Sequence, residues 1–412
     1  MHTYVFAGAS GRALYMYAHP MLKDFPEDCK ILGVYDINYG RAKSFAEDCG
    51  GAFPAFEDFE DMMAKVRPER VIVTTVDAFH SDYIIRALEL GCDVITEKPM
   101  TIDAPRCRAI LDAEKRTGHH VTVTFNYRYA PFMTKIKEIV ASGEIGEVYS
   151  VHFEWLLTRN MDYGAHGKSY FHRWNARMKN SGGLLVHKST HHFDLINWFI
   201  DQHPSRVSAF GQLRLYGAKN YPFGDEIPTR CSTCPHAAEC EFFHEFSEDE
   251  KRFFVANEQY DGYMKDNCIY AKDIDIYDTM AVTVQYDKGA VLSYALNATT
   301  PYEGWTCVIN GSKGRVEAVN SETGVLSKAP ENHIRVFDLH DNITDYAMTK
   351  ATGGHGGGDQ RLRRMIFVGN VPDPLGHAAG SLDGAYSILV GAAANLSIKE
   401  NRVVSIEELL RG

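Results

Sequence analysis

Two short segments carry side chains that could move a proton and assist the departure of a hydride. Glu97 and Lys98 directly follow the β-branched run 93–96, and His187 and His191 stand four residues apart, ahead of an apolar stretch. An ammonium group can polarise a substrate hydroxyl, and an imidazole near its neutral-range pKa can accept the hydroxyl proton. Together these residues predict acid/base chemistry on a secondary alcohol.

The second segment is predicted to begin a helix, because it follows two glycines and precedes an apolar run. On that helix His187, His191 and Asp194 would share one face at i, i+4 and i+7. Two histidines spaced in this way can also hold zinc if His355 or Asp359 supplies a further ligand. In a third interpretation, neighbouring backbone groups simply satisfy the histidines.

A glycine turn follows the first strand-like run, residues 4–7. It has the form G-x-G-x-x-G/A, with serine at the middle glycine and alanine at the last. Such a turn lets a pyrophosphate approach the backbone, and the following helix offers its first amides to the phosphates. The residues expected to bind the dinucleotide here are Gly8, Ser10, Gly11, Arg12 and Ala13.

The second strand-like run ends at Asp36, about where the adenosine ribose hydroxyls of a dinucleotide should lie. A carboxylate there favours NAD over NADP, because it would repel a 2′-phosphate. Arg41 could swing toward such a phosphate and permit NADP. The alternative is a glycine turn that binds no nucleotide, with Asp36 as a solvated strand end.

Four of the nine cysteines are clustered in a predicted insertion near residues 225–270. Only the first pair has zinc-ribbon spacing, but a structural zinc would order a segment too small to bury its own core. An iron–sulfur cluster, or thiols that are free or paired, are the alternatives. The predicted ligands are Cys231, Cys234, Cys240 and Cys268.

The pattern of predicted secondary structure that must position these groups changes along the chain. Strand-like and amphipathic segments alternate over residues 1–125, which predicts a doubly wound parallel sheet of the Rossmann type. Residues 126–412 carry longer strands joined by tight turns, which predicts an α+β domain with a large open antiparallel sheet. The predicted strands are 4–7, 30–35, 70–75, 93–96 and 121–125, then 146–155, 280–286, 290–298 and 306–316.

Composition narrows the possible partners. The 412 residues carry 43 basic and 54 acidic side chains, a formal net charge of −11, which makes nucleic acid an unsuitable partner. No apolar run approaches the roughly 20 residues of a membrane helix. The first strand begins so early that no room is left for a cleavable signal peptide. We therefore expect a cytoplasmic protein that binds no membrane.

Taken in order, the motifs resemble the Gfo/Idh/MocA family of sugar and inositol oxidoreductases. The resemblance spans nearly the whole chain. Its segments are the opening glycine turn, Thr75-Val76-Asp77 with His80, Glu97-Lys98-Pro99, Phe125-Asn126-Tyr127-Arg128, residues 143–148, Gly182-Gly183-Leu184-Leu185 through His191 and Asp194, and residues 311–315.

The resemblance implies roles for individual residues. Lys98 would be the catalytic lysine, Glu97 would lie near the nicotinamide ribose, and His191 would be the general acid/base. His187 stands where the family usually has an acid, so the tuning of His191 differs here. Further cofactor contacts would come from Thr75, His80 and Asn126, and substrate contacts from Tyr127, Arg128, Trp174, His187 and His191, although Trp174 could equally serve packing.

Three functions are compatible with these residues. The first is an NAD-dependent oxidoreductase that acts on a sugar, glycoside or cyclic polyol and forms a homo-oligomer through its antiparallel sheet. The second is an NAD-dependent glycoside hydrolase or lyase, in which transient oxidation permits elimination; the resemblance includes such enzymes, and residues 354–359 are similar to a stretch that they carry. The third is a non-catalytic NAD- and sugar-sensing regulator, which would not need to retain Lys98 and His191.

Overall fold

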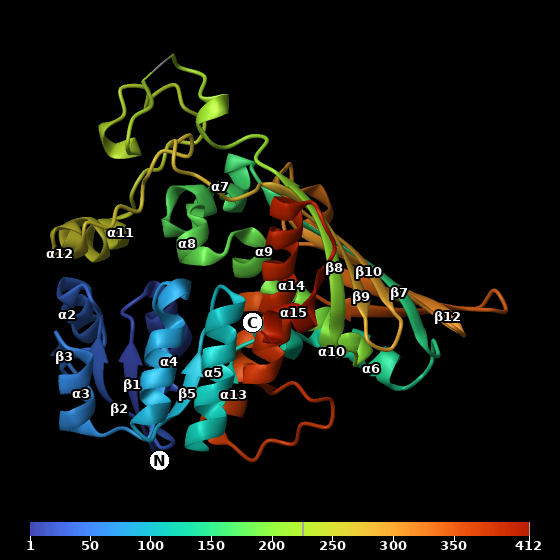
Figure 1. Ribbon diagram of the computed structural model, residues 1–412, viewed down its shortest axis with the longest axis horizontal. Coiled ribbons are helices and arrows are strands. Elements are labelled where there is room, and N and C mark those ends of the chain that lie inside the picture. Colours follow the sequence, from blue (N-terminus) through green and yellow to red (C-terminus); the bar gives the residue numbers. More distant parts are fainter. Residues whose placement is uncertain (225, 412) are drawn as a thin grey trace.

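The computed structural model describes residues 1–224 and 226–411, and two sheets dominate it (Figure 1). Six parallel strands and one short antiparallel strand make the first sheet, in the order β15-β6-β5-β4-β1-β2-β3. The predicted Rossmann sheet is confirmed. Its strands are β1 (His2–Ala7), β2 (Cys29–Tyr35), β3 (Ala55–Phe56), β4 (Arg70–Val73), β5 (Asp93–Thr96), β6 (Val121–Val123) and β15 (Ala379–Gly380).

Helices cover both faces of this sheet, and side chains fix where several of them begin. Asn38, Asp58 and Asp103 each accept a hydrogen bond from the backbone amide three residues later, at the starts of α2, α3 and α5. Strand order reverses beside β1, so the carboxyl ends of β1 and β4 form the crevice where doubly wound folds bind ligands. The helices are α1 (His19–Lys23), α2 (Tyr39–Asp48), α3 (Phe59–Val66), α4 (His80–Glu89) and α5 (Ala104–Thr117).

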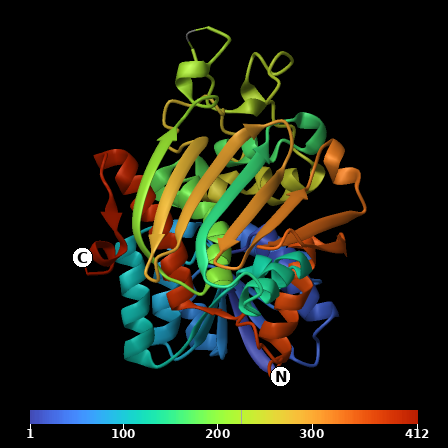
Figure 2. The same ribbon diagram turned by 90° about the vertical axis from the view of Figure 1, so that its right-hand side faces the viewer.

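Nine strands form the second sheet, in the order β14-β13-β12-β11-β7-β10-β9-β8-β16, and Figure 2 looks onto its outer face. Every neighbouring pair is antiparallel except β7 and β10, which are parallel. The expected strand 306–316 is instead a hairpin. The strands are β7 (Val148–Thr158), β8 (Pro204–Gln212), β9 (Thr279–Tyr286), β10 (Val291–Thr300), β11 (Gly304–Gly311), β12 (Gly314–Ser321), β13 (Glu331–Asp338), β14 (Ile343–Thr349) and β16 (Val404–Ser405).

The inner face of this sheet buries alternate side chains of β7, such as Phe153 and Trp155, against helices. The predicted helix over 187–194 is in fact two. The first ends at His187 and the next begins at Thr190, so His187 and His191 lie on different helices. These helices are α6 (Pro131–Ala141), α7 (His166–His172), α8 (Met178–Ser181), α9 (Leu184–His187), α10 (Thr190–Ile200), α14 (Ser381–Glu400) and α15 (Ile406–Arg411).

The last part of the chain returns to the first sheet. Helix α13 (Gly358–Val368) packs Leu362 and Phe367 into the same apolar cluster as Tyr4 and Phe6 of β1. The ring centroids of Tyr4 and Phe367 are 5.8 Å apart in an edge-on arrangement. Residues far beyond position 125 therefore complete the core beneath the predicted dinucleotide-binding domain.

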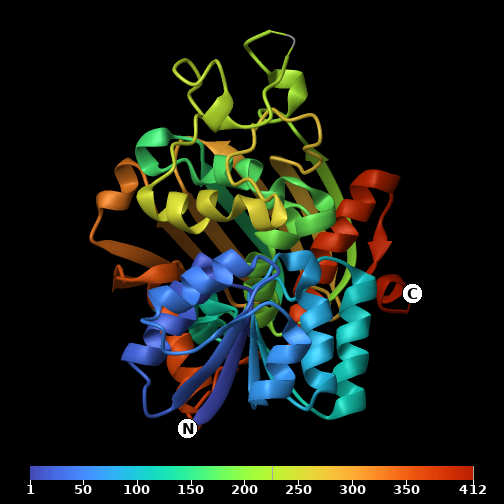
Figure 3. The same ribbon diagram turned by 90° about the vertical axis from the view of Figure 1, so that its left-hand side faces the viewer.

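The chain between β8 and β9 rises above both sheets and carries α11 (Glu248–Phe253) and α12 (Glu258–Asp261) (Figure 3). It contacts α2, where Arg252 pairs with Asp48 and where a Cβ at Gly40 would lie 2.1 Å from Asn257 Oδ1. Asp225, at the start of the predicted insertion, lies outside the described residues. Over residues 1–224 and 226–411, no helix combines the length and apolar character needed to cross a bilayer.

Candidate functional site

The glycine turn has the geometry that a dinucleotide requires. Gly8 has φ +108°, and a Cβ there would lie 2.7 Å from the backbone of Thr74 and Thr75. A Cβ at Gly11 would meet nothing within 4 Å, so open space borders the turn. Ser10 Oγ accepts from the amide of Ala13 at 3.0 Å and fixes the start of the helix. The turn fits a pyrophosphate beside the backbone.

Asp36 lies at the carboxyl end of β2, as the ribose assignment requires. Its carboxylate accepts from the amides of Ala9 and Asn38, both at 2.8 Å, and from Arg41 Nη2 at 3.1 Å. Arg41 Nη2 also lies 2.5 Å from Asp261 Oδ2 of α12. Burial raises the pKa of Asp36, and Arg41 and the two amides oppose that rise. Arg41 is thus held between two carboxylates.

His80 and Thr75, both expected at the cofactor, lie next to the crevice. The imidazole of His80 spans two carbonyl oxygens, with Nδ1 2.9 Å from that of Pro99 and Nε2 3.0 Å from that of Thr75. The pKa of His80 is lowered by burial, and the neutral imidazole donates to one of these two carbonyls. His80 thereby packs between the two turns at the ends of β4 and β5.

Glu97 belongs to a buried network at the same edge of the sheet. Its Oε1 accepts from Arg12 Nε at 2.7 Å and from the Tyr17 hydroxyl at 2.6 Å. These partners hold the pKa of Glu97 below its usual value although burial acts to raise it. Arg12 Nη1 also lies 3.5 Å from Asp359, to which Asn126 Nδ2 donates at 2.7 Å. The predicted residues Arg12, Glu97 and Asn126 are thus brought together.

Lys98 lies where β5 ends, and its Nζ donates to the carbonyl of His187 at 3.1 Å. Burial lowers the pKa of Lys98 to about 8, an effect that Asp77 opposes and the charge of Lys188 reinforces. His187 Nδ1 lies 2.5 Å from Asp77 Oδ2. Where the family usually places an acid, this chain therefore has an imidazole bound to an acid from the other domain. Asp77 belongs to the motif Thr75-Val76-Asp77, which by itself assigns it no role; its position just beyond β4 was the available signal.

His191, on α10, is 2% exposed, and its Nδ1 has no hydrogen-bond partner among the described residues. Its ring packs edge-on against Tyr127 at 4.8 Å between centroids and lies 5.7 Å from the ring of His355. Burial and the charge of Lys98 hold the pKa of His191 well below its ordinary value. The imidazole is therefore neutral at pH 7, and its Nδ1 is buried.

Two residues predicted to bind substrate, Arg128 and Trp174, differ in their burial and contacts. Arg128 is 3% exposed, and it binds Asp194 through Nε at 2.8 Å and Nη2 at 2.5 Å. Its Nη1 donates to the carbonyl of Gly376. Arg128 therefore serves the core of the second domain, and we do not assign it to substrate. Trp174 is half-buried, with its ring edge-on to His187 at 5.5 Å.

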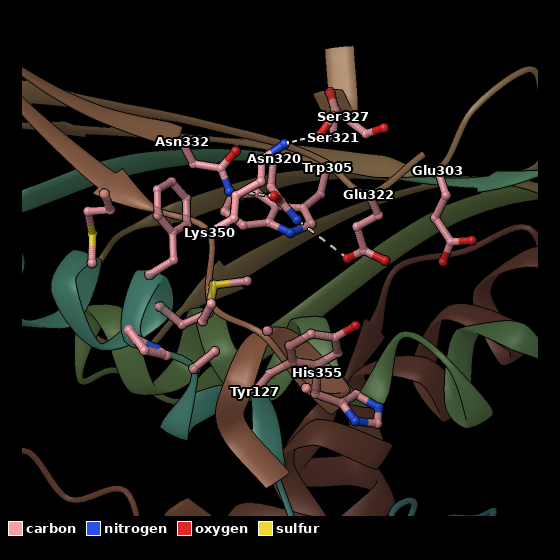
Figure 4. A pocket seen from close by; sticks show the side chains of 18 of the residues that line it. Tyr127, Glu303, Trp305, Asn320, Ser321, Glu322, Ser327, Asn332, Lys350 and His355 are labelled. Atoms are coloured by element: carbon pink, nitrogen blue, oxygen red, sulfur yellow. Dashed lines mark hydrogen bonds between the residues drawn. The ribbon is translucent and has the colours of Figure 1, made fainter. Parts of the chain in front are cut away.

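A cavity of about 550 Å³ lies under the inner face of β11–β14, and two of its lining residues, Tyr127 and His355, have their rings beside that of His191 (Figure 4). Tyr127 and His355 line one side, and Trp305, Glu303 and Glu322 line the side toward the sheet. No motif marked these residues: Trp305 lies on β11, Glu303 directly precedes that strand, and Glu322 directly follows β12. The cavity is also lined by His166, Lys188, Asn320, Asn332 and Lys350.

The expected zinc site is not supported. Cys231, Cys234, Cys240 and Cys268 do line one small cavity of about 20 Å³, and each is a free cysteine. Within residues 1–224 and 226–411, however, no group of three or more His, Cys, Asp or Glu side chains has a geometry that could hold a metal. This also removes the alternative zinc at His187, His191 and His355. Burial raises the pKa of Cys231 to about 12, which keeps its thiol protonated.

Comparison with known proteins agrees with this geometry. Residues 2–125 match the NAD-binding Rossmann fold of the Gfo/Idh/MocA oxidoreductase family, and residues 137–406 match that family's C-terminal α/β domain. The oxidoreductase-family protein YteT of Bacillus subtilis (strain 168) is 38% identical over 100% of this chain and 99% of its own length. Inositol 2-dehydrogenase of Rhizobium meliloti (strain 1021) is 24% identical over 92% of each chain.

The fold of this chain is also similar to that of a solved structure. The WlbA dehydrogenase of Chromobacterium violaceum, in complex with NADH and UDP-GlcNAcA, superposes with a TM-score of 0.65 at 18% identity, covering 98% of this chain and 95% of that one. Both family domains are present in order and together span nearly all of the sequence. The chain belongs to the Gfo/Idh/MocA oxidoreductase family.

Proposed function

We propose that the protein is an NAD-dependent dehydrogenase of a sugar, a glycoside or a cyclic polyol, and that it oxidises a carbon bearing a secondary hydroxyl. One observation carries the proposal: Lys98 and His191 lie together at the crevice, and burial has lowered the pKa of both. Buried groups with such shifted pKa values are typical of proton-transfer sites.

The residues fit a bound dinucleotide. Gly8 and the open space beside Gly11 admit a pyrophosphate, and Asp36 offers a carboxylate to ribose hydroxyls. When bound, NAD supplies the hydride acceptor. We assign NAD rather than NADP because Arg41, the cation nearest Asp36, is already engaged by Asp36 and Asp261.

Proton transfer falls to the two basic side chains. His191 takes the hydroxyl proton, since its imidazole is neutral at pH 7 and lies close enough to Lys98 to feel its charge. The Lys98 ammonium donates to the same oxygen and stabilises the negative charge that develops on it. The pairing of His187 with Asp77 fixes the backbone carbonyl that holds Lys98.

A redox-neutral glycoside hydrolase or lyase is the second candidate, and His355 favours it. The imidazole of His355 lies 5.7 Å from His191 and hydrogen-bonds Asp359 at 3.1 Å. A second base beside the first could remove the acidified proton next to an oxidised carbon, which would permit elimination of the glycosidic substituent.

One screen tests both candidates. Purified protein with NAD is presented with hexoses, inositols and glycosides, while NADH absorbance and product composition are recorded in parallel. Net NADH with an oxidised ring supports the dehydrogenase. Cleaved glycoside without NADH supports the hydrolase or lyase. Neither product, in a protein that binds NAD, contradicts the proposal.

A further inference from the structure

The cavity beneath β11–β14 is larger than the reacting ring needs. At roughly 30 Å³ for each water-sized group, about 550 Å³ holds more groups than one hexose contains. Its wall reaches the proton-transfer centre through Tyr127 and His355, whose rings lie 4.8 and 5.7 Å from that of His191. Tyr127 and His355 thus border both the cavity and His191, so we expect a ligand that reacts at His191 to reach this cavity.

Lys188 is a buried cation at the wall of the cavity, and nothing in the site described so far employs it. It is 6% exposed, and its Nζ lies 4.9 Å from the ring of Trp155 and 6.0 Å from that of Tyr127. Among residues 1–224 and 226–411, Lys188 Nζ has no hydrogen-bond or ion-pair partner. A buried ammonium without such a partner is costly unless a ligand supplies one.

Acidic groups face the same space. Glu303 is held by His166, with Nδ1 and Oε1 2.8 Å apart, whereas Glu322 has only a long contact of 3.5 Å from Asn320. Glu322 is an exposed residue, and partial desolvation and the charge of Glu303 raise its pKa. Glu322 therefore presents oxygens to the cavity that can accept a hydrogen bond.

The amide of Asn332 donates to Asn320 at 2.6 Å, and Lys350 donates to the carbonyl of Ser327 at 2.7 Å (Figure 4). The wall thus presents amide, ammonium and carboxylate groups together with the indole of Trp305. Hydroxyl groups both donate and accept, so they match this mixture, in which the acids Glu303 and Glu322 offset the cations Lys188 and Lys350. A saturated ring also suits an aromatic wall.

We infer that this cavity is a subsite for a second, neutral glycosyl residue, so that the preferred substrate is a disaccharide or a longer glycoside rather than a free monosaccharide. The inference rests on the proposed function, because it assumes that the first ring reacts at Lys98 and His191. Lys188 and Glu322 would hydrogen-bond the hydroxyls of the second ring.

The test compares ligands that differ only in the second ring. Full-length protein with NAD is assayed with glucose, galactose and mannose, with their methyl glycosides, and with disaccharides that carry each as the terminal ring. We expect kcat/KM for the best disaccharide to exceed that of its methyl glycoside by about tenfold or more, the scale of one or two hydrogen bonds to charged groups. Equal values would overturn the subsite.

Variants localise the effect. Glu322→Gln and Asn332→Trp should lower the ratio of disaccharide to methyl-glycoside kcat/KM, the first by weakening a polar contact and the second by filling the cavity. Glu317→Gln is the matched control, since Glu317 lies on the outward side of β12 and pairs with Arg315. A ratio unmoved in both cavity variants would overturn the assignment.

Two further outcomes are separable. A preference for glucuronides over glucosides would overturn the neutral character of the second ring. Binding of NAD without any product from the panel, with or without cleavage, would count against the proposed function itself and not only against the subsite.

Discussion

The two ends of the predicted cofactor crevice differ in how fully their charged and polar groups are paired. At the ribose corner, Asp36, Arg41 and Asp261 satisfy one another within hydrogen-bond distance. At the reacting corner, His191 keeps a nitrogen without a partner in the described chain, and Lys98 has a single carbonyl. Paired groups give a firm binding surface, whereas under-paired buried groups have shifted pKa values and are ready to exchange protons. Removing charge at each corner should therefore have different consequences.

The largest effect is expected at the reacting corner. Lys98→Met and His191→Ala should each lower kcat by about a hundredfold or more, because each removes a group that assists proton transfer. NAD affinity, measured by fluorescence titration, should change little. Lys313→Met, at an exposed position, is the control. Turnover near that of the unmodified protein in either variant would remove that residue from the mechanism.

The pH dependence of kcat tests the ionisable groups at the reacting corner. Lys98 works as an ammonium with a pKa of about 8, so kcat should fall as the pH rises through that value. His191 is already neutral well below pH 6.5, so no acidic limb is expected near neutrality. In Asp77→Asn the carboxylate that supports the ammonium is lost, and the alkaline limb should move to lower pH. A limb that stays in place would show that Asp77 carries no charge there.

At the ribose corner the effect should be on binding alone. Asp36→Ala removes the acceptor for ribose hydroxyls and should weaken NAD by about tenfold, the scale of a hydrogen bond to a charged group. It also removes one of the two carboxylates that hold Arg41 and the negative charge that would repel a 2′-phosphate, so NADP should lose less affinity than NAD or gain some. Calorimetric titration with both cofactors measures this. Unchanged NAD affinity would contradict the ribose assignment.

The smallest effect concerns the insertion. Asp261→Asn weakens the hold of α12 on Arg41 without touching the reacting corner, so the ratio of NADP to NAD affinity should rise severalfold while kcat with NAD stays the same. Asp249→Asn, exposed on the neighbouring helix α11, is the matched control. If both variants behave alike, Arg41 is not restrained by the insertion.

The predictable part of the site is the part that is local in sequence. Gly8, Asp36 and Lys98 each follow a strand directly, so a short motif gave both their position and their chemistry. The fold was predicted from periodicity in the same way. The exception is the single helix expected over 187–194, which is interrupted by the two residues between α9 and α10.

The remainder of the site depends on contacts between distant segments. His187 and Asp77 are 110 positions apart, and Arg41 and Asp261 are 220 apart. Glu322 and Lys188 face the same cavity only because β11–β14 fold over the helices. Arg128, which was predicted at the substrate from its motif, forms its pair with Asp194, another residue distant in sequence. No single-chain pattern contains these pairings.

The return of α13 to the first sheet affects how the chain can acquire its shape during synthesis. Tyr4 and Phe6 emerge first from the ribosome, whereas Leu362 and Phe367, which cover them, emerge some 360 residues later. At about 5–20 residues per second, that interval is roughly 20–70 s. For that time one apolar face of the nascent nucleotide-binding half stays uncovered, so its final packing waits until most of the chain has been made.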